Sequence, residues 1–155
     1  MSKSSFDKTA RLLASDFGVK GGRRGQMNCH ILCLPWPPTL NHYYTVARNR
    51  KILDRAGRDY KEACRMALIG WETPEEPLDG DLQITMTFHP PEFIKSAVRK
   101  QRWGKRKWDL SNRIKPVEDA LVENRILRDD CAIHHLYLHK GCPKGSGCVE
   151  IRIVG

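Results

Sequence analysis

Hydrophobic and polar residues alternate most regularly in residues 82–88. Successive side chains of a β-strand point to opposite faces, so apolar residues at every second position indicate a strand with one buried face. The apolar positions are Leu82, Ile84, Met86 and Phe88, with glutamine or threonine between them. Pro90 and Pro91 follow closely. Because proline cannot donate to a strand ladder, we expect the strand to end before them.

Three further segments, residues 28–34, 133–139 and 148–154, are predicted as strands because they are short and rich in β-forming residues. Pro35 is expected to end the first of them. A connector rich in glycine and containing one proline separates the other two. Such connectors are typical of turns, so we expect these two strands to form a hairpin.

Helical spacing is found in two segments. Asp54 is expected to cap the first helix, at about residues 55–70. Its apolar stripe consists of Tyr60, Cys64, Ala67 and Leu68. Residues 109–130 read as the second helix, with carboxylates at both ends and a buried stripe of Leu110, Ile114, Val117 and Leu121.

Pro116 restricts where the second helix can begin, because a proline deep inside a helix removes a hydrogen bond and clashes with the preceding turn. A late start with Ser111 or Asn112 as the cap would leave Pro116 close to the tolerated first turn. A kink at Pro116 is the alternative. Asn124 breaks the helical pattern, and a short turn is expected to lead to Asp129 and Asp130.

The predicted order of elements is β-α-β-α-β-β. This order predicts an α+β fold in one domain, with a mixed β-sheet and two main helices on one face. The length of 155 residues suits a single domain. Residues 1–26 combine a short helical pattern with a basic, glycine-rich linker, so we expect an N-terminal extension there and a folded domain at residues 27–155.

The chain is strongly basic, with 27 Lys and Arg against 18 Asp and Glu and a formal net charge of +9. This balance favours a polyanionic partner such as nucleic acid, with an anionic membrane surface as the competing interpretation. There is no apolar run of membrane-spanning length and no secretory leader pattern, and the six cysteines lack the spacing of a secreted scaffold. We therefore expect a cytoplasmic protein.

Basic residues are concentrated between residues 95 and 108, where no acidic residue occurs. Neutralising DNA phosphates releases counterions, so a loop of like charge favours DNA binding. Trp103 and Trp108 could stack on unpaired bases. The candidate DNA-binding residues in this loop are Lys95, Arg99, Lys100, Arg102, Lys105, Arg106 and Lys107. A solvated charge run is the plainer interpretation, but such runs usually mix signs.

Asp109 and Asp130 flank the second helix, and Asn112, Lys115 and Asp119 share its polar face. If the chain folds back after the helix, the two aspartates meet, with a lysine beside them. Mg²⁺ is commonly held by one or two carboxylates, and a lysine can offset charge that develops on a phosphate. Taken alone, each of these residues could be explained by helix capping or by turn formation. Their combination favours a Mg²⁺ site. Mn²⁺ could occupy the same site.

Two ordered motifs resemble the RusA family of Holliday-junction resolvases, over about residues 27–155. The first motif is Asp109-Leu110-Ser111-Asn112, then Lys115, Asp119-Ala120-Leu121, Ile126-Leu127 and Asp129-Asp130. The second is Leu34-Pro35-Trp36-Pro37-Pro38-Thr39-Leu40-Asn41-His42-Tyr43-Tyr44. The resemblance implies a homodimeric, Mg²⁺-dependent endonuclease that nicks four-way DNA junctions in recombination and repair.

The resemblance also assigns roles. It implies that Asp109 and Asp130 are metal ligands and that Lys115 is the essential lysine; Asn112 would shape the site. Ser111 stands where the best-studied members have a second aspartate, so we expect Ser111 to be a weaker ligand and Asp119 or Asp129 to supply the missing charge.

The stiff proline-rich loop of the second motif holds Trp36 and Asn41, and the resemblance places this loop near the DNA. Trp36 could equally form a structural corner of the core. For the whole chain, the alternative to a junction-cleaving enzyme is a non-catalytic DNA-junction-binding protein that has lost cleavage.

Overall fold

The computed structural model describes residues 28–95, 100–102 and 108–155. The expected N-terminal extension at residues 1–26 lies outside the described residues. Among the described helices, none has the length and apolar character needed to cross a lipid bilayer.

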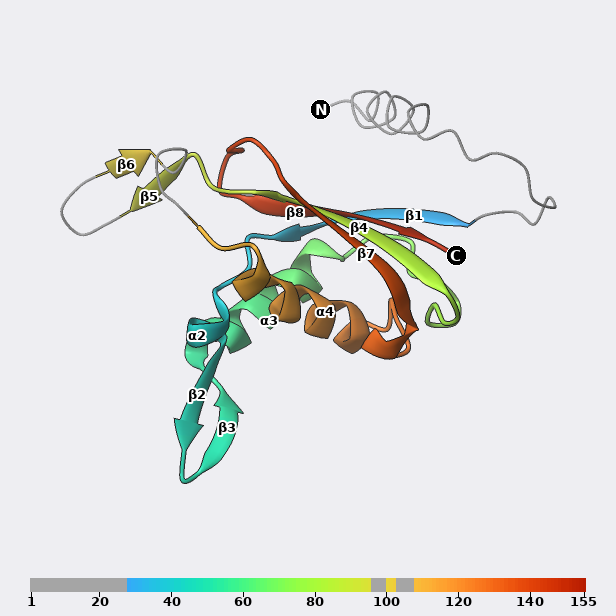
Figure 1. Ribbon diagram of the computed structural model, residues 1–155, viewed down its shortest axis with the longest axis horizontal. Helices are drawn as coiled ribbons and strands as arrows, with labels where there is room; N and C mark the ends of the chain where they lie inside the picture. The colour runs from blue at the N-terminus through green and yellow to red at the C-terminus, as the bar shows by residue number, and fades with distance from the viewer. Residues whose placement is uncertain (1–27, 96–99, 103–107) are drawn as a thin grey trace.

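A four-stranded mixed sheet forms one layer of the protein (Figure 1). Its strands, in spatial order, are β1 (Cys29–Pro35), β8 (Cys148–Val154), β4 (Leu82–His89) and β7 (Ile133–Lys140). The first two pairs are antiparallel, and β4 pairs with β7 in parallel. All four predicted strands are therefore present, each within a residue or so of its expected bounds.

The predicted hairpin of the last two strands is wrong, because β4 lies between β7 and β8. The connector crosses the end of β4, where the Gly141 N–H donates to the carbonyl of Phe88 at 2.8 Å and the Lys144 N–H donates to the carbonyl of Pro90 at 2.9 Å. This crossing delivers β8 to the far side of β4. Turn-forming residues in the connector between β7 and β8 do not reveal that another strand, β4, lies between these two strands.

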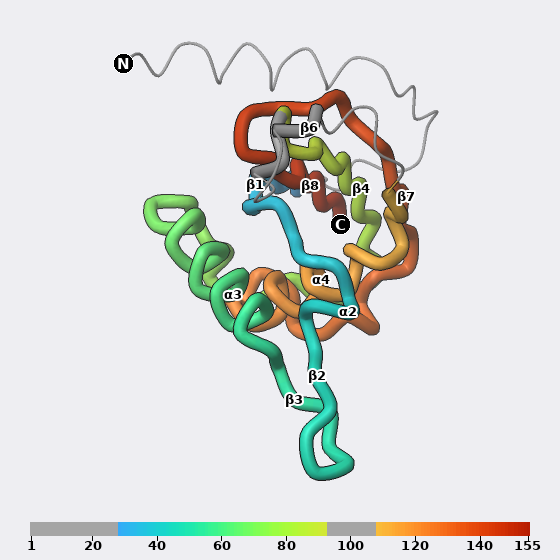
Figure 2. The backbone as a smooth tube through the Cα atoms, turned by 90° about the vertical axis from the view of Figure 1, so that its left-hand side faces the viewer, coloured from blue at the N-terminus to red at the C-terminus, as the bar shows by residue number. Residues whose placement is uncertain are grey.

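The main helices, α3 (Arg55–Ala67) and α4 (Ile114–Glu123), cover the same face of the sheet, as Figures 1 and 2 show. The core lies between these layers. The sheet contributes alternate residues of β4 together with Leu32, Leu34, Val149, Ile151 and Ile153. The helices contribute Tyr60, Cys64, Val117, Ala120 and Leu121. The predicted α+β class and the placement of both helices on one face are confirmed.

α4 begins late, as Pro116 required. A single 3₁₀ turn, η2 (Ser111–Arg113), precedes it, so Pro116 is the third residue of α4 and lies in the first turn, where no intrahelical N–H bond is needed. The helix expected over residues 109–130 is thus confined to ten residues. α3 likewise ends at Ala67, earlier than predicted, and the Asp54 side chain accepts from the Arg55 N–H at 2.7 Å as its cap.

Two short hairpins were not predicted. After the four-residue helix α2 (Leu40–Tyr43), β2 (Tyr44–Ala47) and β3 (Arg50–Leu53) form an arm that extends away from the layers (Figures 1 and 2). Arg48 and Asn49 both have positive φ, which is the backbone geometry of a tight type I′ turn. β5 (Phe93–Lys95) pairs with β6 (Lys100–Arg102), so a hairpin begins just before the stretch expected to be a basic loop and continues into it.

Close packing of α3 on α2 depends on Gly57. A Cβ atom at this position would lie 2.6 Å from the Tyr43 carbonyl oxygen. Alanine is the better helix former by ~1 kcal/mol, but steric overlap in a packed interior costs about 1–3 kcal/mol. We therefore expect Gly57→Ala to lower the thermal unfolding midpoint, measured by circular dichroism.

Asp59→Ala, at an exposed position of the same helix, is the control and should change stability by less than about 0.5 kcal/mol. A Gly57→Ala variant as stable as the unsubstituted protein would contradict the packing argument.

Candidate active site

Asp109 is an exposed residue two positions before the first residue of η2. Its Oδ1 accepts from the Ser111 N–H at 3.0 Å and from the Ser111 hydroxyl at 2.7 Å, and its Oδ2 accepts from the Asn112 side-chain amide at 3.1 Å. The hydrogen bonds from Ser111, with the nearby charge of Lys140, hold the pKa of Asp109 below its usual range. Asp109 is therefore an oriented, ionised carboxylate at neutral pH.

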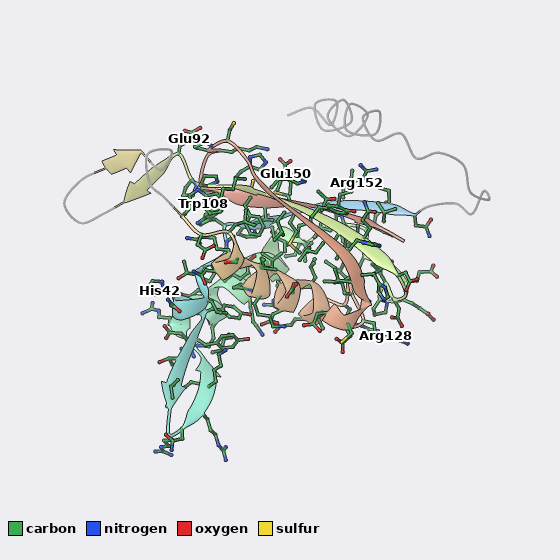
Figure 3. The ribbon with its side chains drawn as sticks, in the orientation of Figure 1. His42, Glu92, Trp108, Arg128, Glu150 and Arg152 are labelled. Carbon is green, nitrogen blue, oxygen red and sulfur yellow. The ribbon has the colours of Figure 1, made fainter. Side chains whose placement is uncertain are left out.

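Lys140 reaches this region from the end of β7. Its Nζ donates to the Trp108 carbonyl at 2.9 Å and lies 4.8 Å from the centre of the Trp108 ring. Figure 3 shows Trp108 between the end of the sheet and the start of the helical segment. The last residue of β7 thus helps to fix the backbone that carries Asp109.

Lys115, in the first turn of α4, lies between two carboxylates. Its Nζ is 2.7 Å from Asp130 Oδ2 and 3.0 Å from Asp119 Oδ1. The hydrogen bond to Asp130 and then the attraction of Asp119 raise the pKa of Lys115 above its ordinary value. Lys115 is therefore a fixed ammonium group, and the predicted shared face of Lys115 and Asp119 is confirmed.

A chain reversal after α4 brings Asp130 to Lys115. Arg125 adopts a positive φ just beyond the last turn of α4. The backbone of Leu78 then fixes the returning segment: its N–H donates to the Ile126 carbonyl and its carbonyl accepts from the Arg128 N–H, both at 2.9 Å. The returning chain enters the 3₁₀ turn η3 (Asp130–Ala132) next to α4.

η3 is capped by Asp129, whose Oδ1 accepts from the Cys131 N–H at 3.0 Å. Possible ligand atoms of Asp129, Asp130 and Cys131 all lie within 4.8 Å of one another. Asp109 is not a member of this group. It forms a separate hydrogen-bonded group with Ser111 and Asn112, three residues before Lys115 in the sequence. The meeting of Asp109 and Asp130 at one cation stays a prediction.

An open cleft of about 350 Å³ lies at Lys115. Its walls combine ammonium and carboxylate groups with one apolar side chain. The lining residues are Lys61, Lys115, Asp119, Val122, Glu123, Asp129 and Asp130. The carboxylate oxygens suit a hard cation and the lysines suit a phosphate, so the donor set fits a cation and an anionic substrate side by side.

Trp36 packs as a structural residue. Its ring lies edge-on to Phe88 and Trp108, with ring centres 6.4 Å and 5.3 Å apart. The guanidinium of Arg113 lies 4.5 Å from the centre of the Trp36 ring. These contacts support the interpretation of Trp36 as a corner of the core, whereas Asn41 is exposed on α2.

The basic candidates between residues 95 and 108 are only partly described. Lys95 belongs to β5, and Lys100 and Arg102 belong to β6, so these backbones lie in a hairpin. Arg99, Lys105, Arg106 and Lys107 lie outside the described residues.

Sequence reasoning missed two contributions. Arg113, which is only 6% exposed, donates from its guanidinium to the Pro37 carbonyl and so ties η2 to the proline-rich loop. Tyr44 donates its hydroxyl to Asp119 Oδ2 at 2.8 Å across 75 positions of sequence. Tyr44 was part of the second motif, but no local pattern reveals a contact over such a separation.

Fold and site together are those of a small α+β protein with a mixed acidic and basic cleft. A model of the family described as Endodeoxyribonuclease RusA matches residues 35–154. The chain belongs to this family, which indicates a nuclease, and the family acts on branched DNA. No curated protein sequence matches the chain.

Arg113 provides a test of how the loop and η2 are held together. Arg113→Ala removes the hydrogen bond to Pro37 and the contact with Trp36, so we expect it to lower the free energy of unfolding by about 2–4 kcal/mol. Urea denaturation followed by tryptophan fluorescence measures the change. Arg58→Ala, at an exposed position, is the control; equal losses in the two variants would show that burial of Arg113 has no special role.

Proposed function

We propose that the protein is a Mg²⁺-dependent, structure-specific endodeoxyribonuclease that hydrolyses phosphodiester bonds in four-way DNA junctions. The observation that carries the proposal is the fixed Lys115 ammonium between Asp119 and Asp130, in a cleft that also offers carboxylate ligands. Membership of an endodeoxyribonuclease family supports the same chemistry.

Asp109 and Asp130 would hold the cation, with Ser111 and Asp129 as the neighbouring oxygen donors. Mg²⁺ supplies Lewis acidity at a phosphoryl oxygen and lowers the pKa of water. The Ser111 hydroxyl donates a hydrogen bond to Asp109, so Ser111 would orient the Asp109 carboxylate toward the cation. Asn112 fixes the other carboxylate oxygen of Asp109. Mn²⁺, which prefers similar ligands, is a suitable substitute.

Lys115 would offset negative charge on the phosphate or on the leaving oxygen. A preorganised ammonium group needs no reorientation when that charge develops, which is the condition for electrostatic catalysis. The high pKa of Lys115 makes it an electrostatic and hydrogen-bonding group and not a general base at neutral pH.

DNA would be held by basic side chains of the β5–β6 stretch and of the β2–β3 arm. The candidates of the β5–β6 stretch are Lys95, Arg99, Lys100, Arg102, Lys105, Arg106 and Lys107, and Asn41 would contact DNA from α2. The β2–β3 arm adds exposed basic residues, Arg48, Arg50 and Lys51. A net charge of +9 supports this arrangement.

A homodimer would present two equivalent clefts to the two symmetry-related strands of a junction. We place this activity in the cytoplasm, in DNA recombination and repair. The rival function is junction binding without cleavage, which the serine at position 111 favours if the site requires an aspartate there.

Asp109→Asn tests the proposed mechanism. Removing a ligand charge should lower the rate of Mg²⁺-dependent nicking of a synthetic four-way junction by ~100-fold or more, because the cation contributes several kcal/mol to stabilising the transition state. Junction binding in a gel-shift assay should remain. Asp59→Asn, another exposed aspartate, is the control. Unchanged nicking by Asp109→Asn would refute the assigned role, and no nicking by the unsubstituted protein would favour the rival.

Ser111→Asp tests the departure from the best-studied family members. If the serine leaves the site short of one carboxylate, the aspartate should raise the nicking rate by about tenfold at low Mg²⁺ concentration, as expected for a stronger ligand set. The measurement is the rate as a function of Mg²⁺ concentration. An unchanged or lower rate would mean that the serine site is already complete.

A further inference from the structure

Asp119 connects the candidate catalytic lysine to a residue far away in the sequence. One carboxylate oxygen, Oδ1, is 3.0 Å from Lys115 Nζ, and the other, Oδ2, accepts from the Tyr44 hydroxyl at 2.8 Å. Both oxygens of Asp119 are therefore engaged, and its side chain is oriented from two sides. The mostly buried Asp119 side chain, 20% exposed, keeps these contacts partly shielded from water.

Tyr44 is itself fixed at the base of the β2–β3 arm. Its ring lies edge-on to that of Tyr43 with 4.7 Å between ring centres, and Tyr43 is completely buried. Lys51 of β3 places its Nζ 4.3 Å from the centre of the Tyr44 ring on the arm side. The Tyr44 hydroxyl is thus directed at Asp119 by packing and does not depend on a flexible loop.

Lys115 needs such support because a lysine side chain has four rotatable bonds and an ammonium group that bonds in any direction. Asp130, its other partner, is an expected cation ligand. A carboxylate that binds a cation attracts the ammonium less strongly, so the contact with Asp119 is the one that remains to orient Lys115 in the loaded site.

We propose that Asp119 and Tyr44 are positioning residues, which hold the ammonium of Lys115 in place when Asp130 also binds a cation. The proposal rests on the proposed nuclease function and adds two residues to it. It also assigns a role to the β2–β3 arm, whose first residue completes the support of Lys115.

Kinetics of junction nicking give the first test. Tyr44→Phe removes one hydroxyl and keeps the ring, and we expect kcat to fall about tenfold, as for loss of one hydrogen bond to a charged group, with KM nearly unchanged. In an Asp119→Asn background, Tyr44→Phe should cause no further loss, because both residues act through Lys115. Tyr137→Phe, on an exposed tyrosine, is the matched control and should retain full kcat.

The second test does not require cleavage. Nuclear magnetic resonance of the lysine ammonium groups in the full chain, with the Lys115 signal identified by its loss in Lys115→Gln, reports directly on the environment of Nζ. We expect Tyr44→Phe and Asp119→Asn to shift this signal and to speed its proton exchange with water, and Tyr137→Phe to leave it unchanged.

Two results would overturn the positioning role: a Lys115 signal that is the same in Tyr44→Phe and in the unsubstituted protein, or additive losses of kcat in the double variant. An unsubstituted protein that fails to nick junctions in Mg²⁺ would instead refute the proposed function, and the ammonium signal would still decide whether Tyr44 orients Lys115.

Discussion

The reversal of the chain between α4 and η3 is the constraint on which the site depends. Without it, Asp130 would follow the axis of α4 away from Lys115. Two features impose the reversal: the left-handed conformation of Arg125, and the pair of backbone hydrogen bonds in which Leu78 donates to Ile126 and accepts from Arg128. Ile126 and Leu127 are buried in the core, so apolar burial reinforces the same path. Core packing and backbone pairing thus bring Asp129 and Asp130 to the carboxylates and the lysine of α4.

Elements with a strong internal pattern could be predicted from the sequence. The alternation in β4 and the stripe of α4 depend on which residues face the core. Pro116 indicated the late start of α4, but the expected cap was wrong, because Arg113 and neither Ser111 nor Asn112 is the N-cap. The insertion of β4 between β7 and β8 could not be predicted, because the choice of neighbours in a sheet depends on a strand far away in the sequence. The β2–β3 turn was missed because Arg48 and Asn49 lack the glycine that usually marks positive φ.

The candidate site shows the same division. The lysine and the aspartates stood out from residue type and spacing along one helix, and the contact of Lys115 with Asp119 followed from a separation of four residues. Tyr44 and Arg113 could not be assigned, because their partners lie more than 70 positions away. Trp36 illustrates a different difficulty: an aromatic residue in a proline-rich loop suits both base stacking and core packing, and only its neighbours distinguish the two.

The position of β8 has a consequence for how the chain folds. β8 is the last strand in the sequence, but it lies between β1, the first, and β4. During synthesis on the ribosome, β1 and β4 emerge long before the strand that joins them, so the backbone edges that pair with β8 stay without a partner until then. Pairing across so many residues makes folding slow relative to helical proteins of this size. Loss of this one strand would separate the sheet into unconnected parts, so we infer that the domain folds as a single late step and is exposed to aggregation until then.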